Sequence, residues 1–230
     1  ASAGAFDGID TSWKRVPGGA EIGRILREAA DTFVPEHPEK TVPRLLEARR
    51  RAAAIRHPWA RIKAAEIEEA VALCAGLWLD APAGRYAALP GSTLPVNATV
   101  INRSAFPFSL ANVSLDSSPA GPGPSELGYN QVRVNTLKWN LPASEPYSQP
   151  FWLRKPLRGA RYAIDDPNLI GQPDRPPVLT VRFELQAQDQ ILGFTRPVHY
   201  RYADPDRGEL TRPLDVVPAV AVNLPERVFV

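Results

Sequence analysis

The chain has 230 residues, a length that fits one large domain or two small ones, because compact domains cluster near about 100 to 150 residues. Its apolar content of 44% is enough for a packed core and excludes a chain that is disordered throughout. The 27 basic and 25 acidic residues are well mixed and leave a net charge of +2, which disfavours a polyanionic partner such as nucleic acid.

Proline marks a boundary within the sequence. Five of the 25 prolines lie in residues 1–80, and the other twenty lie in residues 81–230. Proline interrupts helices and central strands, so its frequency indicates which kind of element a segment can form. We therefore expect a helical bundle region over 1–80 and a β-sandwich domain over 81–230.

Three amphipathic helices are predicted before residue 80, because apolar residues recur at spacings of three and four. The predicted helices cover residues 18–34, 42–55 and 59–78. In the third helix, the apolar face is expected to include Trp59, Ile62 and Trp78. Three helices within so short a segment predict a small antiparallel bundle.

Strands are predicted after residue 80, where apolar residues begin to alternate. The alternating runs are residues 92–102, 106–115, 132–137, 179–185, 191–194, 198–202, 216–222 and 227–230. The alternation slips by one position at Ala111-Asn112, which indicates a β-bulge. Short strands at this spacing predict an immunoglobulin-like antiparallel β-sandwich, so the expected fold class is α+β in two segregated parts.

A long irregular insert rich in proline is predicted over residues 141–177. The candidates for ligand or interface contact lie in or beside it: Trp139, Tyr147, Trp152 and Tyr162. Exposed rings in such a segment can stack on a sugar or a peptide. The alternative is that the four rings close the ends of the sandwich, where large apolar side chains are usually buried.

No catalytic, cofactor-binding or metal-binding residue is assigned from the sequence. The histidines at positions 37, 57 and 199 lack the short spacing of a zinc site, and His199 is expected to point outward from a strand. Neither a P-loop nor a G-x-S-x-G motif is present. Asp165-Asp166 and Asp204-Pro205-Asp206 place paired carboxylates beside proline, which is typical of turns.

Three absences add to this interpretation. The sequence has no methionine, which we take to indicate a segment cut from a longer polypeptide. It has no uninterrupted apolar run of about 18 residues, so no membrane span is predicted. Cys74 is its single cysteine, which excludes an intramolecular disulfide.

Several phrases of the sequence are distinctive, above all Pro-Tyr-Ser-Gln-Pro-Phe-Trp at 146–152. The full set comprises residues 6–13, 16–19, 146–156, 162–177 and 196–210. These phrases look like the region that follows the catalytic domain in long bacterial members of the LmbE-like (PIG-L) deacetylase family. The resemblance extends over nearly the whole chain.

The resemblance implies an accessory role. Family members are zinc-dependent hydrolases that deacetylate N-acetylated sugars, and their catalytic domain carries A-H-P-D-D and a later H-x-x-H. This chain lacks both motifs, since residues 36–40 share only His37-Pro38 with the first. The chain would then be the non-catalytic C-terminal region of a deacetylase whose zinc lies in a missing domain. Long members are often exported, so an exported or periplasmic parent is expected.

Three functional hypotheses remain open. The first is an accessory region whose partner is the parent's own deacetylase domain. The second is a carbohydrate-binding sandwich that uses the candidate aromatic residues to bind a glycan. The third is a structural interaction protein, either a homodimer or a docking unit. An independent enzyme would have only the paired aspartates as candidate catalytic groups.

Overall fold

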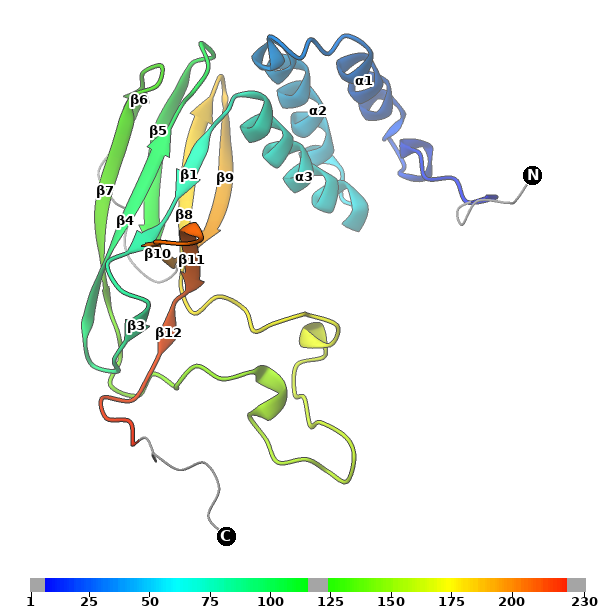
Figure 1. Cartoon of the computed structure of the whole chain (residues 1–230). Helices are drawn as coiled ribbons and strands as arrows, with labels where there is room; N and C mark the ends of the chain where they lie inside the picture. The colour runs from blue at the N-terminus through cyan, green and yellow to red at the C-terminus, as the bar shows by residue number, and fades with distance from the viewer. Residues whose placement is uncertain (1–6, 116–123, 223–230) are drawn as a thin grey trace.

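The computed structural model describes residues 7–115 and 124–222. Over these residues the fold is mixed α+β, with three α-helices that precede the strands (Figure 1). The helices are α1 (Ala20–Asp31), α2 (Val42–Ala54) and α3 (Pro58–Cys74). The mixed α+β class expected from the sequence is confirmed. The predicted strand at 227–230 lies outside the described residues.

Helices α1 and α2 bury the side chains that their periodicity predicts. In α1, Ile22 and Ile25 are buried, and in α2 the buried residues include Leu45 and Leu46. Spacings of three and four place these side chains on one side of each helix, since a helix has 3.6 residues per turn. The helix α2 lies between α1 and α3 (Figure 1).

The third helix differs from its prediction in length and in buried face. It ends at Cys74, where the Leu77 N–H donates to the Ala72 carbonyl (2.9 Å), and Trp78 lies in a strand. Trp59 and Ile62 were expected to be buried but are 54% and 46% exposed. The buried face consists of Ala60, Ile67, Val71 and Ala72. The spacings of seven and four from Ala60 to Ile67 and Val71 place these three side chains on one side of the helix, away from Trp59 and Ile62.

The strands form two larger sheets and one short pair within the described ranges. The first sheet has the order β1-β4-β2-β10-β11, and β7 pairs with β4. Its strands are β1 (Trp78–Asp80), β2 (Pro82–Ala83), β4 (Thr93–Ile101), β7 (Val132–Asn140), β10 (His199–Asp204) and β11 (Gly208–Pro213). The second has the order β6-β5-β8-β9. Its strands are β5 (Phe108–Leu115), β6 (Ser125–Leu127), β8 (Thr180–Ala187) and β9 (Gln190–Pro197).

The β-bulge predicted in β5 is confirmed. The register against β8 shifts between Leu110 and Asn112, so Leu110 pairs with Leu185 and Val113 pairs with Phe183. The extra residue, Ala111, absorbs the slip in alternation and keeps the apolar side chains on the buried face.

Two short pairings contradict the expectation of an antiparallel sheet throughout. β10 runs parallel to β2, and β12 (Asp215–Val216) runs parallel to β3 (Ala87–Ala88). A tight hairpin forces neighbouring strands to be antiparallel, but these strands are joined by long stretches of chain that leave their direction free.

The helices and sheets share one core. Their buried apolar side chains form a single continuous cluster that runs from α1 to β12. Polar contacts also join α2 and α3 to β9: the Gln190 side-chain amide donates to the Leu46 carbonyl (3.0 Å), and Arg196 donates to Glu69 (2.8 Å). The helical region therefore packs directly against the edge of the four-stranded sheet.

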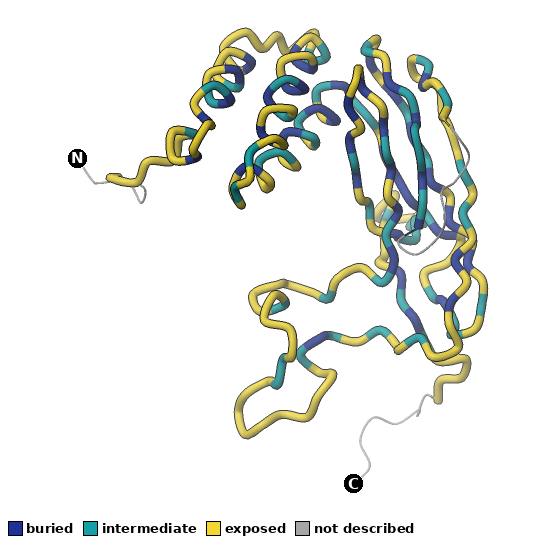
Figure 2. The backbone as a smooth tube through the Cα atoms, turned by 180° about the vertical axis from the view of Figure 1, so that it is seen from behind, coloured by how far each residue is buried: buried dark blue, intermediate teal, exposed yellow. Residues whose placement is uncertain are grey.

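Between β7 and β8 the chain leaves the sheets and forms a projecting segment, residues 142–178. It contains two 3-10 turns, η3 (Phe151–Leu153) and η4 (Pro167–Leu169). In Figure 1 it extends to the same side of the sheets as the helices, and Figure 2 shows that most of it is exposed.

Candidate functional site

The four aromatic candidates do not share one surface. Trp139 lies in β7 opposite Leu94 of β4 and is only 8% exposed. Its side chain lies on the same side of β7 as that of Leu137, which packs against the core, while Val132 and Val134 lie on the other side and are exposed. Trp139 is therefore a core residue, and its prediction as a contact residue is wrong.

Trp152 packs within the projecting segment. Its ring meets the ring of Phe151 edge to face, with 4.8 Å between centroids and an interplanar angle of 86°. Phe151 is buried, although it lies in a segment that is otherwise mostly exposed. This geometry gives the Trp152 ring a packing contact that holds the 3-10 turn η3 in place.

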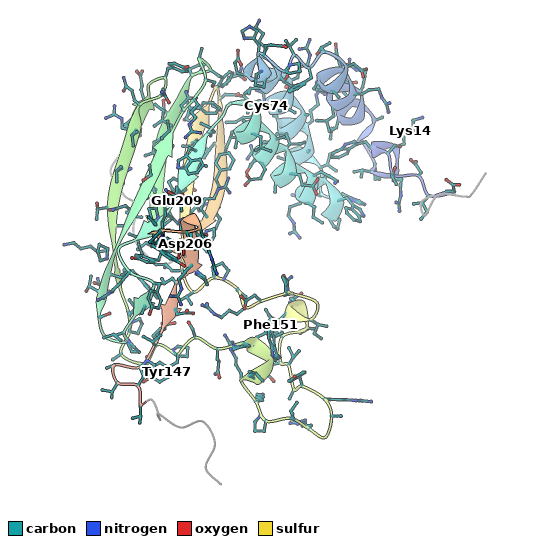
Figure 3. The ribbon with its side chains drawn as sticks, in the orientation of Figure 1. Lys14, Cys74, Tyr147, Phe151, Asp206 and Glu209 are labelled. Atoms are coloured by element: carbon teal, nitrogen blue, oxygen red, sulfur yellow. The ribbon has the colours of Figure 1, made fainter. Side chains whose placement is uncertain are left out.

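Tyr147 lies in a groove between the two arms of the projecting segment. The groove has a volume of about 310 Å³. Pro146, Tyr147 and Arg154 line it from the arm that leaves β7, while Asp166, Leu169 and Pro177 line it from the arm that returns to β8. The Tyr147 side chain is 55% exposed, and Figure 3 labels it on the first arm together with Phe151. We call this feature the Tyr147 groove.

Both arms of the groove are tied to β12. The Ser148 N–H donates to the Val216 carbonyl, and the Val216 N–H donates to Ser148 Oγ, each at 2.8 Å. On the other arm, Arg175 donates to the Leu214 carbonyl (2.8 Å) and forms an ion pair with Asp215. These bonds fix the ends of the arms, so the groove is held by the sheet region despite its irregular backbone.

The groove combines an exposed aromatic ring with polar groups of both kinds. Arg154 supplies hydrogen-bond donors, and Asp166 supplies acceptors. Asp166 Oδ1 accepts from the Asn168 N–H (2.9 Å) at the start of η4, which confirms the turn role predicted for this carboxylate. A ring beside such groups can bind a ligand that presents an apolar face and several hydroxyls.

The Tyr147 groove is also where two of the distinctive phrases meet. Residues 146–156 contribute one wall, and residues 162–177 contribute the other. Sequence reasoning singled out Tyr147 but missed Arg175 and Asp166 as its neighbours, because they come from the opposite arm. The recurrence of proline on both arms was the only signal that the arms are extended.

Tyr162 lies elsewhere, in the loop between η3 and η4. It lines a separate pocket with Lys155, Arg158 and Arg161. Lys155 forms an ion pair with Asp165 (2.5 Å). Asp165 lines the same pocket, so three basic residues and one acidic residue surround Tyr162.

His199 lies in a cluster that sequence reasoning missed. Its Nε2 is 3.5 Å from Oδ1 of Asp80, and Arg201 donates to Oδ2 of the same carboxylate (2.5 Å). Asp80 is buried, and His199 is mostly covered, so the expectation that His199 points into solvent is wrong. The Asp80 carboxylate accepts a hydrogen bond from Arg201 and lies beside His199, so it joins β1 to β10, which is a structural role.

The three histidines lie apart from one another. His37 lies on the surface 3.4 Å from Glu39, and His57 Nδ1 accepts from the Trp59 N–H (3.2 Å) at the start of α3. His199 lies in β10, where its ring faces the Asp80 carboxylate. Among residues 7–115 and 124–222, no three His, Cys, Asp or Glu side chains come together in a way that could hold a metal ion.

Within the same described ranges, no helix is both long enough and apolar enough to cross a membrane.

Comparison with known proteins yields little. No protein-family model matches the chain, and no curated protein matches it. A search of solved structures finds the sporulation control protein Spo0M of Bacillus subtilis, with 9% identity, a TM-score of 0.31 and coverage of 61% of this chain. The chain spans about half of Spo0M, 49% of its length.

The search also finds the CARDB domain of PF1109 from Pyrococcus furiosus. Its solution structure matches with 10% identity and a TM-score of 0.29, over 61% of this chain and 95% of the domain. A crystal structure of the same domain in complex with di-metal ions gives the same identity and TM-score. Similarity at this level carries no inference about the fold or the function of this chain.

Proposed function

We propose that the chain is a non-catalytic accessory region of a zinc-dependent deacetylase of the LmbE-like (PIG-L) family, which acts on N-acetylated sugars. Its partner would be the deacetylase domain of the same parent protein, and the parent would be exported or periplasmic. Zinc and the hydrolytic chemistry belong to that domain, and this chain contributes contact surface and stability.

One observation carries this proposal. The two phrases of the projecting segment that resemble the family, residues 146–156 and 162–177, meet as opposite walls of the Tyr147 groove. Segments that are distinctive in composition, yet mostly exposed, are expected where a surface makes contacts. The groove is such a surface, and the hydrogen bonds of Ser148 and Arg175 to β12 hold it in shape.

The finer architecture belongs to the same proposal. We infer that the helices form an antiparallel three-helix bundle and that the two larger sheets form an immunoglobulin-like β-sandwich. The support is the single buried cluster that includes side chains of both sheets and of the helices. The sandwich would present the projecting segment from one end.

Two measurements test the accessory role. The purified chain is expected to bind no stoichiometric zinc and to release no acetate from N-acetylglucosamine oligomers. The gene is expected to encode A-H-P-D-D followed by H-x-x-H upstream of Ala1 in the same reading frame. Stoichiometric zinc with acetate release, or an upstream frame without the two motifs, would overturn the proposal.

A second candidate function is carbohydrate binding in the Tyr147 groove. The observation that favours it is the exposed Tyr147 ring next to the donors of Arg154 and the acceptors of Asp166. Pyranose rings bind to aromatic faces through their C–H groups while their hydroxyls need such polar partners.

Calorimetric titration with N-acetylglucosamine oligomers tests this candidate. Tyr147→Ala is expected to lower the affinity at least tenfold, while Tyr129→Ala, which removes an exposed tyrosine ahead of β7, should leave it unchanged. An absence of heat with the unmodified chain would remove the candidate. Light scattering at several concentrations would then address the third hypothesis, a homodimer or docking unit.

A further inference from the structure

The far loop of the projecting segment, residues 153–162, has an unusual composition for an exposed turn. It connects η3 to η4 and lies at the end most distant from the sheets (Figure 1). Two of its apolar side chains, Leu153 and Leu157, are 55% and 56% exposed. We call residues 153–162 the tip; its basic residues are Arg154, Lys155, Arg158 and Arg161.

The tip has a defined turn that gathers its cations. The Arg158 N–H donates to the Arg161 carbonyl (3.0 Å), and the Arg161 N–H donates back to the Arg158 carbonyl (3.2 Å). Gly159 occupies the turn with φ of 62°, which favours glycine. Arg158 and Arg161 then line one pocket of about 480 Å³ together with Lys155.

The charge of the tip is not balanced locally. Lys155 is paired with Asp165, but none of the ion pairs among residues 7–115 and 124–222 involves Arg154, Arg158 or Arg161. Arg158 and Arg161 line the same pocket and take part in none of these ion pairs, so their like charges repel each other, and a nearby anionic surface would remove that cost. Exposed leucines beside them add an apolar area that gains from leaving water.

We propose that the tip binds an anionic lipid surface. Leu153 and Leu157 enter the boundary between headgroups and acyl chains, and the arginines donate to lipid phosphates. Tyr162 lies next to the arginines, and the amphipathic ring of tyrosine suits the headgroup region. This inference goes beyond the accessory role and does not depend on it.

A soluble acidic polysaccharide is the competing partner. It would satisfy the arginines, but it would leave Leu153 and Leu157 in water. A lipid surface accounts for both the cations and the exposed leucines, and the projecting shape allows the tip to reach such a surface ahead of the sheets (Figure 2).

Vesicle co-sedimentation with the purified chain tests the proposal. Binding is expected to phosphatidylcholine vesicles that contain phosphatidylglycerol, and not to phosphatidylcholine alone. Each cation near such a surface contributes about fivefold to the partition coefficient, so Arg158→Ala/Arg161→Ala should lower it by about 25-fold. Leu153→Ser/Leu157→Ser should make the remaining binding sensitive to salt.

The matched control is Arg133→Ala/Lys138→Ala on β7, which removes two exposed cations far from the tip and should leave binding unchanged. Circular dichroism of each variant checks that it folds. Equal binding to both vesicle types, a control that loses as much as the tip variant, or binding of polygalacturonate without binding of vesicles would each overturn the lipid assignment.

Discussion

Arg49 of α2 and Glu68 of α3 form an ion pair against the backbone of β9, with 2.6 Å between Nη2 and Oε1. The same guanidinium donates to the Ile191 carbonyl (3.0 Å), and Glu68 Oε2 accepts from the Gly193 N–H (3.3 Å). The two side chains are only 21% and 13% exposed. Both charged groups are therefore largely withdrawn from water. Their contacts with each other and with β9 join the two helices and the four-stranded sheet into one body.

Glu68→Ala is therefore expected to destabilise the whole chain. The substitution leaves Arg49 without its carboxylate and the Gly193 N–H without its acceptor, so the free energy of unfolding should fall by about 2 kcal/mol. Urea unfolding followed by circular dichroism and by tryptophan fluorescence should give one transition that moves as a unit. Asp189→Ala, which removes the exposed partner of Arg50, should change stability by no more than about 0.5 kcal/mol. Two separate transitions would show that the helices unfold independently.

Deletion of Ala111 is expected to be tolerated. Removing the bulge residue leaves Leu110 opposite Leu185 and Val113 opposite Phe183, so the alternation becomes regular and the loss should be about 1 kcal/mol. Deletion of Ser109 is the control, because either Phe108 or Leu110 must then face outward, at a cost of about 3 kcal/mol or more. Thermal unfolding of the two deletion variants measures both losses of stability. A smaller loss of stability on deletion of Ser109 than on deletion of Ala111 would contradict the register of β5 against β8.

Gly19→Ala is expected to loosen the start of α1. A Cβ at this position would lie 2.6 Å from the Trp13 carbonyl oxygen and 2.9 Å from that of Val16, so the backbone must shift, at a cost of about 2 kcal/mol. Gly84→Ala meets no atom within 4 Å and should be close to neutral. Thermal unfolding and proteolysis ahead of α1 should separate the two variants, and equal effects would count against the packing of residues 13–19.

Cys74 is expected to react slowly with thiol reagents. Burial raises the pKa of its thiol, so at a given pH less of it is the reactive thiolate. Its reaction rate with a chromogenic disulfide should rise at a higher pH than that of Cys74→Ser/Ser144→Cys, whose thiol lies in an exposed loop. Identical pH profiles for the two proteins would show that Cys74 is freely solvated.

Elements governed by local periodicity could be predicted from the sequence. The helices α1 and α2 follow from their apolar spacing, and the bulge follows from the slip at Ala111-Asn112. The face of α3 could not be predicted, because apolar residues lie on more than one side of this helix: Ile67 and Val71 are buried, while Trp59 is exposed. The buried side of β7 could not be predicted either, because apolar residues lie on both sides of this strand.

The candidate site was predictable only in part. Tyr147 could be singled out as an aromatic residue in a proline-rich segment, but its neighbour Asp166 comes from the other arm. The contacts of His199 with Asp80 depend on a parallel pairing of β10 with β2 that no local pattern encodes. Relationships between distant segments are set by packing, and single-sequence patterns do not record them.

The parallel pairing of His199 with Pro82 spans 117 positions of the chain. During synthesis, β2 and β3 would leave the ribosome long before β10 and β12, and their hydrogen-bonding edges would stay open meanwhile. Such late closure slows folding and exposes strand edges to aggregation. Expression of this chain in a cell is therefore expected to depend on chaperones that bind nascent strands, and shortened versions that stop before β10 should collect in the insoluble fraction.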